Sequence, residues 1–466
     1  MSTLSSMPDE VLKLMMQHVP LKDRLGSCCL VSRRMHGAAT AATQDMQLGY
    51  DRQSAFDSAL LYLTKYGEHL TKLELAEFHR GLLRPPCEHL QHLALGGRIS
   101  MQLGMGHGQP GVLHGLTKLT HLELRGNLQD VAGGAVVDNL SSLVHLQHLD
   151  LNPAYRWVGG LSDATLRCLQ QLTYLQVSCL SSENLLQLGG LTNLRGLCLH
   201  VQHVVDFEDI AVGPSSVPGL AFPTCLQKLV LASRVEAGLL SLLPANLQEL
   251  QVLCGVEGPA EGPGSLLSCI ARLQHLTVLR LHPDDTVLPP SGPAYSALTA
   301  SSNLVYFDVS YFRWPEGAWK YVFPAGRRLP HLKCLIFQAR WPAWRDSELT
   351  SLVSCCPGLC DVDTLSLLPG QHVSELRKLT ALTRLRVNYA TVDSASFEEC
   401  MVGLAVVTQL RSLQVRYVRQ VDQSAPVAAL LPLTSLTALS ALEIEWYPRV
   451  EDEYGPLQFT DTKVRT

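Results

Sequence analysis

Three histidines of this 466-residue chain recur in one short phrase, and this recurrence is the pattern closest to a chemical site. His92, His121 and His148 each begin the pattern His-Leu-x-Leu, and Glu123 and Asp150 follow the last two histidines. Three imidazoles with a carboxylate are a ligand set that zinc accepts. If each phrase is a strand, the rings form a column along a sheet and do not converge on one point. The column is then a pH-sensitive partner surface or a row of exposed polar side chains.

Catalytic signatures are missing from the sequence. It contains no Gly-x-Ser-x-Gly motif, no phosphate-binding loop and no His-Glu-x-x-His motif. The pairs His89/His92 and His145/His148 have ligand-like spacing, but they fall across strand starts and not on helices. We therefore expect a binding protein that needs no cofactor and has no catalytic role. A metal-dependent hydrolase built on the three histidines is the alternative from the enzyme class.

A group of arginines near the C-terminal end is a second candidate site. Three of its members occupy alternate positions of two adjacent leucine-rich phrases, where strand geometry points them outward. Bidentate arginine contacts could hold an acidic or phosphorylated segment there. The alternative is a solvated face that Glu443 and Glu445 balance from the next strand. The whole basic patch contains Arg384, Arg386, Arg411, Arg416 and Arg419, with Tyr389 and Tyr417 beside them. Its candidate binding residues, which we call the arginine group, are Arg384, Arg386, Arg416 and Tyr417.

Tryptophans gather in one short stretch of the chain. Four of the six lie between Trp314 and Trp344. The triplets Arg313-Trp314-Pro315 and Arg340-Trp341-Pro342 stand one repeat apart. Tryptophan and arginine are enriched among the residues that dominate protein interfaces. Together with the arginine group, these two triplets are our candidate substrate-binding residues, and the alternative is that the rings pack over their own loops.

Composition narrows the class of protein. An apolar content of 46% excludes a disordered chain, and a net charge of −5 gives no sign of nucleic-acid binding. No positively charged leader precedes an apolar run, and no apolar stretch reaches 18 residues, so we expect no signal peptide, no membrane span and a cytoplasmic or nuclear location. The 14 cysteines are then reduced thiols. The tightest group, Cys355, Cys356 and Cys360, lacks the second pair that a zinc site needs.

The elements that carry these residues follow from a repeated phrase, Leu-x-x-Leu-x-Leu. Its clearest copies begin at Leu119, Leu146, Leu194 and Leu276, and the mean spacing over all copies is about 26 residues, typical of leucine-rich repeats. We expect an α/β solenoid, a horseshoe whose concave parallel sheet has about fifteen strands. Its core should include Leu122, Leu149, Leu197 and Leu279. The fifteen copies begin at Leu70, Leu90, Leu119, Leu146, Leu172, Leu194, Leu226, Leu247, Leu276, Leu304, Leu332, Leu359, Leu382, Leu410 and Leu439.

The chain divides into four predicted regions. Residues 1–48 carry no repeat and are expected to form a small helical domain. Residues 49–68 form an amphipathic helix that caps the first repeat, because the terminal units of a solenoid need a cover. Residues 69–446 hold the repeats. Residues 447–466 form a tail.

The N-terminal region resembles an F-box. It departs from the family pattern at Met7, where leucine is usual, and at Met35, where tryptophan is usual. The segment Cys356-Pro357-Gly358-Leu359 also resembles the start of the cysteine-containing repeats found in F-box proteins. The matching residues are Met7-Pro8-Asp9-Glu10-Val11-Leu12, Met15, Val19, Pro20, Asp23-Arg24 and Leu30-Val31-Ser32-Arg33-Arg34.

The resemblance implies a substrate receptor of a cullin-based ubiquitin ligase. In that family the F-box docks on a Skp-type adaptor that joins a cullin scaffold, and the repeats hold the protein substrate. The alternative is a repeat scaffold that binds proteins without a ligase role, and assistance by a small molecule stays open. The residues that the resemblance assigns to the adaptor-binding module are Pro8, Val11, Leu12, Met15, Leu25 and Val31.

Overall fold

Two compact units make up the computed structural model, and each is described by itself. Unit 1 contains residues 1–208 and 219–225, and unit 2 contains residues 209–218 and 226–466. The structure describes residues 7–19, 38–39, 45–48, 67–75, 87–97, 113, 115–126, 140–151, 161, 163–177, 186–200, 219, 221–232, 234–259, 262, 265–282, 292–310, 314–315, 317–337, 346–364, 373–389, 394–419, 427–448 and 464–465.

Every copy of the leucine phrase carries a strand. Side chains alternate across a strand, so the two later leucines of each phrase face one side and the residues between them face the other. Leu122, Leu149, Leu197 and Leu279 have no exposed surface, as predicted. The prediction of about fifteen repeat strands is confirmed, with six phrases in unit 1 and nine in unit 2.

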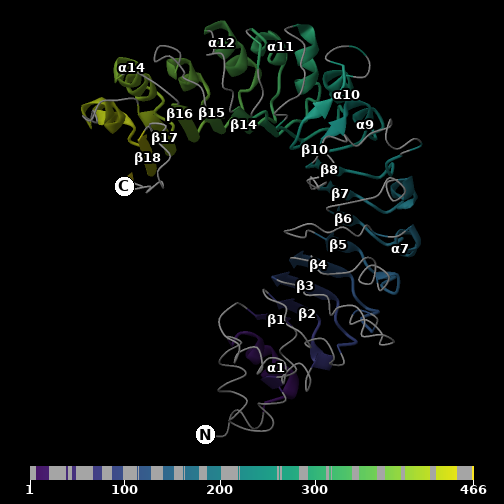
Figure 1. Cartoon of the computed structure of the whole chain (residues 1–466). Helices are drawn as coiled ribbons and strands as arrows, with labels where there is room; N and C mark the ends of the chain where they lie inside the picture. Colours follow the sequence, from purple (N-terminus) through teal and green to yellow (C-terminus); the bar gives the residue numbers. More distant parts are fainter. Residues whose placement is uncertain are drawn as a thin grey trace. The chain divides into compact units, whose positions relative to one another are not determined.

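Unit 1 is a parallel sheet in chain order (Figure 1). Helix α1 (Asp9–Gln17) precedes it, and α7 (Asp163–Cys168) lies between β5 and β6 in the chain. The strands are β1 (Asp45–Leu48), β2 (Lys72–Leu75), β3 (His92–Gly97), β4 (His121–Gly126), β5 (His148–Leu151), β6 (Tyr174–Val177) and β7 (Gly196–Leu199).

Unit 2 continues the same pattern, and its helices lie on one side of the sheet (Figure 1). The two-residue strands β9 (Val235–Glu236) and β11 (Val256–Glu257) form a separate small ladder. The main strands are β8 (Lys228–Leu231), β10 (Glu249–Val252), β12 (Val278–Leu281), β13 (Tyr306–Asp308), β14 (Cys334–Phe337), β15 (Asp361–Thr364), β16 (Arg384–Tyr389), β17 (Ser412–Arg419) and β18 (Ala441–Pro448). The helical segments include α9 (Ala237–Ser241), α10 (Leu266–Ala271), η4 (Pro293–Thr299), α11 (Trp319–Val322), α12 (Asp346–Cys355), η5 (Ser374–Lys378), α14 (Ser394–Leu404) and η6 (Val427–Ser435).

Hydroxyl side chains join successive repeats just before the strands. A threonine or serine there donates its hydroxyl to a backbone carbonyl of the preceding repeat, over distances of 2.9 to 3.3 Å. Backbone N–H groups donate to the same carbonyls, so each bond of this kind adds to the link between one repeat and the next. The donors are Thr120, Thr173, Thr277, Thr383 and Ser440.

Two strands lie outside the predicted repeat region. Strand β1 pairs in parallel with β2, so the segment predicted to be only helical also contributes a strand. In the predicted tail, β19 (Val464–Arg465) pairs antiparallel with β18. The predicted capping helix falls mostly outside the described residues, and its last described part is the 3-10 turn η2 (Gly67–His69).

Leucine cores and parallel ladders identify the fold as a leucine-rich-repeat α/β solenoid. Within the described ranges, no helix has the length and apolar character needed to cross a membrane.

Candidate functional site

The predicted histidine column exists, and it is longer than expected. Strand register aligns His92, His121, His148 and Tyr174 on β3 to β6, and we call these four the ring column. Successive ring centroids lie 5.5, 5.4 and 4.4 Å apart, and all three pairs are stacked. Tyr174 was missed because its phrase begins with tyrosine and not histidine.

Glycine ends the ring column. Gly196 on β7 aligns with Tyr174 on β6. A Cβ atom at position 196 would lie 2.7 Å from Cδ2 of the tyrosine ring. The absence of a side chain at Gly196 therefore lets the Tyr174 ring extend over the neighbouring strand.

Carboxylates run beside the ring column. Glu74, Glu123 and Asp150 occupy the outward position two residues further along β2, β4 and β5, and we call them the carboxylate column. Nε2 of His92 lies 3.7 Å from Glu74, and Nε2 of His148 lies 3.9 Å from Glu123. The equivalent position on β3 is an alanine, so His121 has no such carboxylate on the preceding strand.

Two cations form ion pairs with the carboxylate column. Arg125 contacts Glu123 at 2.7 Å and Asp150 at 3.6 Å. Lys72 contacts Glu74 at 2.8 Å, and this hydrogen bond is the main cause that lowers the pKa of Glu74. The two cations thus partly neutralise the carboxylate column.

Two histidines of the ring column, His92 and His148, favour the neutral form. Burial lowers the pKa of His92, and the positive charge of Lys72 and the neighbouring His121 act in the same direction. Burial also lowers the pKa of His148, again with His121 adding to the effect. Glu123 opposes both shifts without cancelling them.

The ring column does not have the geometry of a metal centre. Its rings stack in parallel, whereas metal ligands must point their lone pairs at one position. No group of three or more histidine, cysteine, aspartate or glutamate side chains in the described part of the chain could hold a metal ion. The column therefore forms an extended surface.

In unit 2, aspartates and not the predicted glutamates balance the first two arginines. Arg384 contacts Asp361 at 2.9 Å, and Arg386 contacts Asp363 at 3.1 Å, both across the β15–β16 pair. Burial raises the pKa of Asp363, and the hydrogen bond from Arg386 counteracts this effect. The pattern Asp361-Val362-Asp363 is the signal that sequence reasoning missed.

The other two members of the arginine group lie on β17. Arg416 is exposed and aligns with Asn388 on β16 and with Glu445 on β18. The backbone of Tyr417 aligns with Tyr389 and Trp446, but its side chain lies outside the described part of the structure. Glu443 accepts a hydrogen bond of 2.9 Å from Gln414. The structure thus brings the arginines onto adjacent strands, as predicted.

Trp314 is a core residue, which corrects its prediction as a substrate anchor. Only 4% of it is exposed, and its ring stacks on Trp319 with centroids 4.5 Å apart. Tyr295 also contacts it, and Trp319 packs on Phe337 at 5.4 Å. Because the Trp314 ring is packed within this cluster, it cannot enter a pocket on a partner protein. Arg313, Arg340 and Trp341 lie outside the described residues.

A polar network that the sequence did not reveal occupies β12 and β13. The guanidinium of Arg280 lies 4.5 Å from the ring centroid of Tyr306. His282 contacts Asp308 at 3.1 Å, and the hydroxyl of Ser310 donates to Asp308 at 2.6 Å. Burial alone would raise the pKa of Asp308, but these hydrogen bonds outweigh it and lower the pKa. The network is a fixed polar surface, because its charged groups are already engaged.

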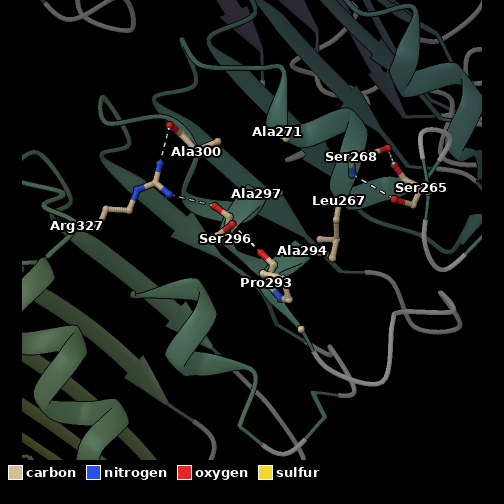
Figure 2. Close-up of a pocket in the computed structure, with 12 residues that line it drawn as sticks. Ser265, Leu267, Ser268, Ala271, Pro293, Ala294, Ser296, Ala297, Ala300 and Arg327 are labelled. Carbon is tan, nitrogen blue, oxygen red and sulfur yellow. Dashed lines mark hydrogen bonds between the residues drawn. The ribbon is translucent and has the colours of Figure 1, made fainter. Parts of the chain in front are cut away.

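A groove of about 540 Å³ lies between α10 and η4, on the helical side of unit 2 (Figure 2). Small apolar residues and serines line it. Its cation, Arg327, donates to the carbonyl oxygens of Ser296 at 3.4 Å and Ala300 at 3.0 Å. Ser265 accepts from the backbone N–H of Ser268 and caps α10. These polar groups join neighbouring helical segments. Arg327 is the charged group among the described residues that line the groove, and its guanidinium is hydrogen-bonded to backbone carbonyls.

Helix α1 has one buried and one exposed apolar stripe. Leu12 and Met16 are buried and pack with Ala38 and Ala39. The second stripe contains Val11, Leu14 and Met15, which are 41%, 57% and 46% exposed. Of the predicted adaptor-binding residues, Leu12 therefore holds the module together, whereas Val11, Met15 and the exposed Pro8 face outward. Leu25 and Val31 lie outside the described residues.

Several of the described cysteines are small core residues. Every cysteine among the described residues is a free thiol, and Cys355 and Cys356 are buried. Burial raises the pKa of Cys356 well above its ordinary value. Buried thiols of this kind are unreactive.

Comparison with known proteins supports no assignment beyond the fold. No family model matches the chain, and no curated protein matches its sequence. A leucine-rich-repeat protein of Leptospira interrogans is similar in structure, with 16% identity and a TM-score of 0.39 over 83% of this chain and 86% of that one. CroV588, a circular leucine-rich-repeat protein, has 15% identity and a TM-score of 0.31 over 81% of this chain and 60% of that one.

Proposed function

We propose that the chain is a protein-binding scaffold that holds its partner on the outward faces of its parallel strands. The observation that carries this proposal is the alignment of polar, charged and aromatic side chains in columns above a leucine core. Such columns form an extended surface fixed by rigid elements, which suits recognition. They do not bring a nucleophile, a base and an oxyanion site together, as catalysis requires.

The proposal is tested by affinity capture with one double variant on each face. The first variant is His121→Ala with Arg125→Ala in unit 1, and the second is Arg384→Ala with Arg416→Ala in unit 2. A matched control, Glu398→Ala with Glu399→Ala, changes two exposed charges on α14.

At least one face variant should lose most of the partner that the parent chain captures, because truncation of a true anchor costs about 2 kcal/mol or more. The helix-side control should capture as the parent does. Full capture by both face variants, with unchanged unfolding transitions, would contradict the proposal.

A second candidate function is that of a substrate receptor in a cullin-based ubiquitin ligase. The F-box resemblance motivates it, and the exposed apolar stripe of α1 supports it, because a large apolar stripe on a surface helix suits a partner protein. In this role α1 would bind a Skp-type adaptor, and the repeats would hold the substrate for ubiquitination. The chain would then work in the cytoplasm or the nucleus.

Co-purification with the adaptor tests the ligase role. Leu14→Glu with Met15→Glu replaces two of the three residues of the exposed stripe and leaves the buried residues of α1 unchanged. Val402→Glu with Val406→Glu, at exposed valines in unit 2, is the matched control. The first variant should lose the adaptor and the second should keep it. If neither variant nor the parent binds the adaptor, the scaffold role stands without the ligase.

A further inference from the structure

The ring column carries an inference that rests on the scaffold function and deepens it. Its three imidazoles are partly exposed on the outward face of β3 to β5, and their centroids lie only 5.5 and 5.4 Å apart. Histidine is the side chain whose ordinary pKa lies nearest to neutral pH. Three such groups in one row can change the charge of this face by three units.

At neutral pH the face is slightly acidic. Lys72 and Arg125 oppose the three members of the carboxylate column, Glu74, Glu123 and Asp150. Burial and the neighbouring cations favour the neutral imidazole at His92 and His148. Two cations and three carboxylates give this set a net charge of −1, which disfavours binding of an acidic segment.

Protonation reverses the sign of the face. With three imidazolium groups the cations outnumber the carboxylates. The side chains of the other two cations are accessible to a partner, since Arg125 is 64% and Lys72 41% exposed. Neighbouring imidazolium rings repel one another, and His121 has no carboxylate beside it on the preceding strand to offset that repulsion. The imidazoles of such a row are protonated more readily when an external anion lies over them.

We propose that the ring column, with Lys72 and Arg125, forms a proton-dependent docking surface for an acidic polypeptide segment. The segment binds weakly at neutral pH and tightly in mild acid. Its carboxylates lie over the imidazolium rings, and each binding event takes up protons from solution. By linkage, the affinity rises as the pH falls.

The described charged groups near the histidines belong to the same sheet. Strand β2 contributes Lys72 and Glu74, β4 contributes Glu123 and Arg125, and β5 contributes Asp150. Strand β6 adds the uncharged Tyr174 and Gln176, whose side chains hydrogen-bond to each other at 2.7 Å. Strand β1 aligns Asp45 with Lys72. None of the described cations other than Lys72 and Arg125 occupies these columns.

The test measures binding of a fluorescein-labelled octaglutamate peptide by anisotropy between about pH 7.5 and about pH 5.5, a range that spans histidine titration. The parent chain should bind about tenfold or more tightly at the acid end, because each proton taken up on binding contributes up to about tenfold per pH unit. The triple variant His92→Gln, His121→Gln and His148→Gln should bind with nearly the same affinity at both ends. A second triple variant with phenylalanine at these positions keeps ring stacking and should also lose the pH dependence.

A matched control separates this surface from the general loss of negative charge in acid. His145→Gln, His275→Gln and His331→Gln removes three exposed histidines elsewhere and should respond to pH as the parent does. Equal tightening in the ring-column variants and the parent would overturn the proposal, and so would an unchanged parent affinity. Capture of the partner at neutral pH is a separate measurement, so failure here leaves the scaffold function intact.

Discussion

The outward faces of the two units share one backbone plan and differ in electrostatics. In unit 1 stacked imidazoles lie beside carboxylates that form ion pairs with Lys72 and Arg125. In unit 2 arginines on β16 meet aspartates on β15 in direct ion pairs. The first face can change its charge near neutral pH, whereas the second keeps its charge over the same range. A repeat protein can thus vary the chemistry of its surface by exchanging single residues within columns, without changing the strands beneath.

Leucine-to-aspartate changes should have the largest effect in both units. Leu197→Asp in unit 1 and Leu335→Asp in unit 2 each place a charge where no surface is exposed. We expect a loss of about 4 kcal/mol or more in the free energy of unfolding, since a buried unpaired charge is among the most costly changes. Denaturant melts with hydrogen exchange would show which unit each variant opens. A variant that melts like the parent would show that the leucine is not buried.

The ion pairs of unit 2 should differ in strength. Arg386→Ala removes the guanidinium that pairs with Asp363, whose side chain is only 10% exposed. This should cost about 2 kcal/mol in unfolding free energy. Arg384→Ala breaks a pair in which the arginine is 53% exposed, and it should cost less than about 1 kcal/mol. Equal costs in urea melts would contradict this ranking.

Gly196 should be sensitive to a single methyl group. Gly196→Ala forces the Tyr174 ring away from its position, because the new Cβ would lie 2.7 Å from it. The expected cost is about 1 kcal/mol, that of a displaced side chain. Gly190→Ala is the control, since a Cβ there meets nothing within 4 Å. Nuclear magnetic resonance of the tyrosine ring should report the displacement only in the first variant.

Mild acid should destabilise unit 1 slightly. The folded state lowers the pKa of His92 and His148 below the ordinary value of 6.5, so the unfolded chain binds more protons just below that value. The free energy of unfolding therefore falls as the pH falls from above 6.5 toward the folded pKa values. His92→Gln with His148→Gln should flatten this dependence in thermal melts. A parent stability that rises with acidity over this range would contradict the sign.

Much of the fold follows from local pattern, because the leucine phrase places each strand and alternation sets its two faces. The histidine column was predictable for the same reason. The partners of Arg384 and Arg386 were not, since Asp361 and Asp363 precede the arginines by a whole repeat and meet them only through strand register.

Burial was harder to predict where both faces of an element are apolar. Helix α1 has two apolar stripes, and sequence alone does not decide that Leu12 packs inward while Met15 stays exposed. Trp314 follows a strand and resembled a surface anchor, but its ring packs on Trp319, five residues further along the chain, and on Tyr295, from the segment before the strand.

Cross-linking with mass spectrometry tests the central claim most directly. The captured partner is treated with a lysine-reactive reagent while bound to the parent chain. Lys72 and Lys228 lie on the sheet faces, whereas Lys320 in α11 and Lys378 in η5 lie on helical segments. A scaffold that binds through its strands predicts partner cross-links at Lys72 or Lys228 and none at Lys320 or Lys378. Cross-links confined to Lys320 and Lys378 would contradict it.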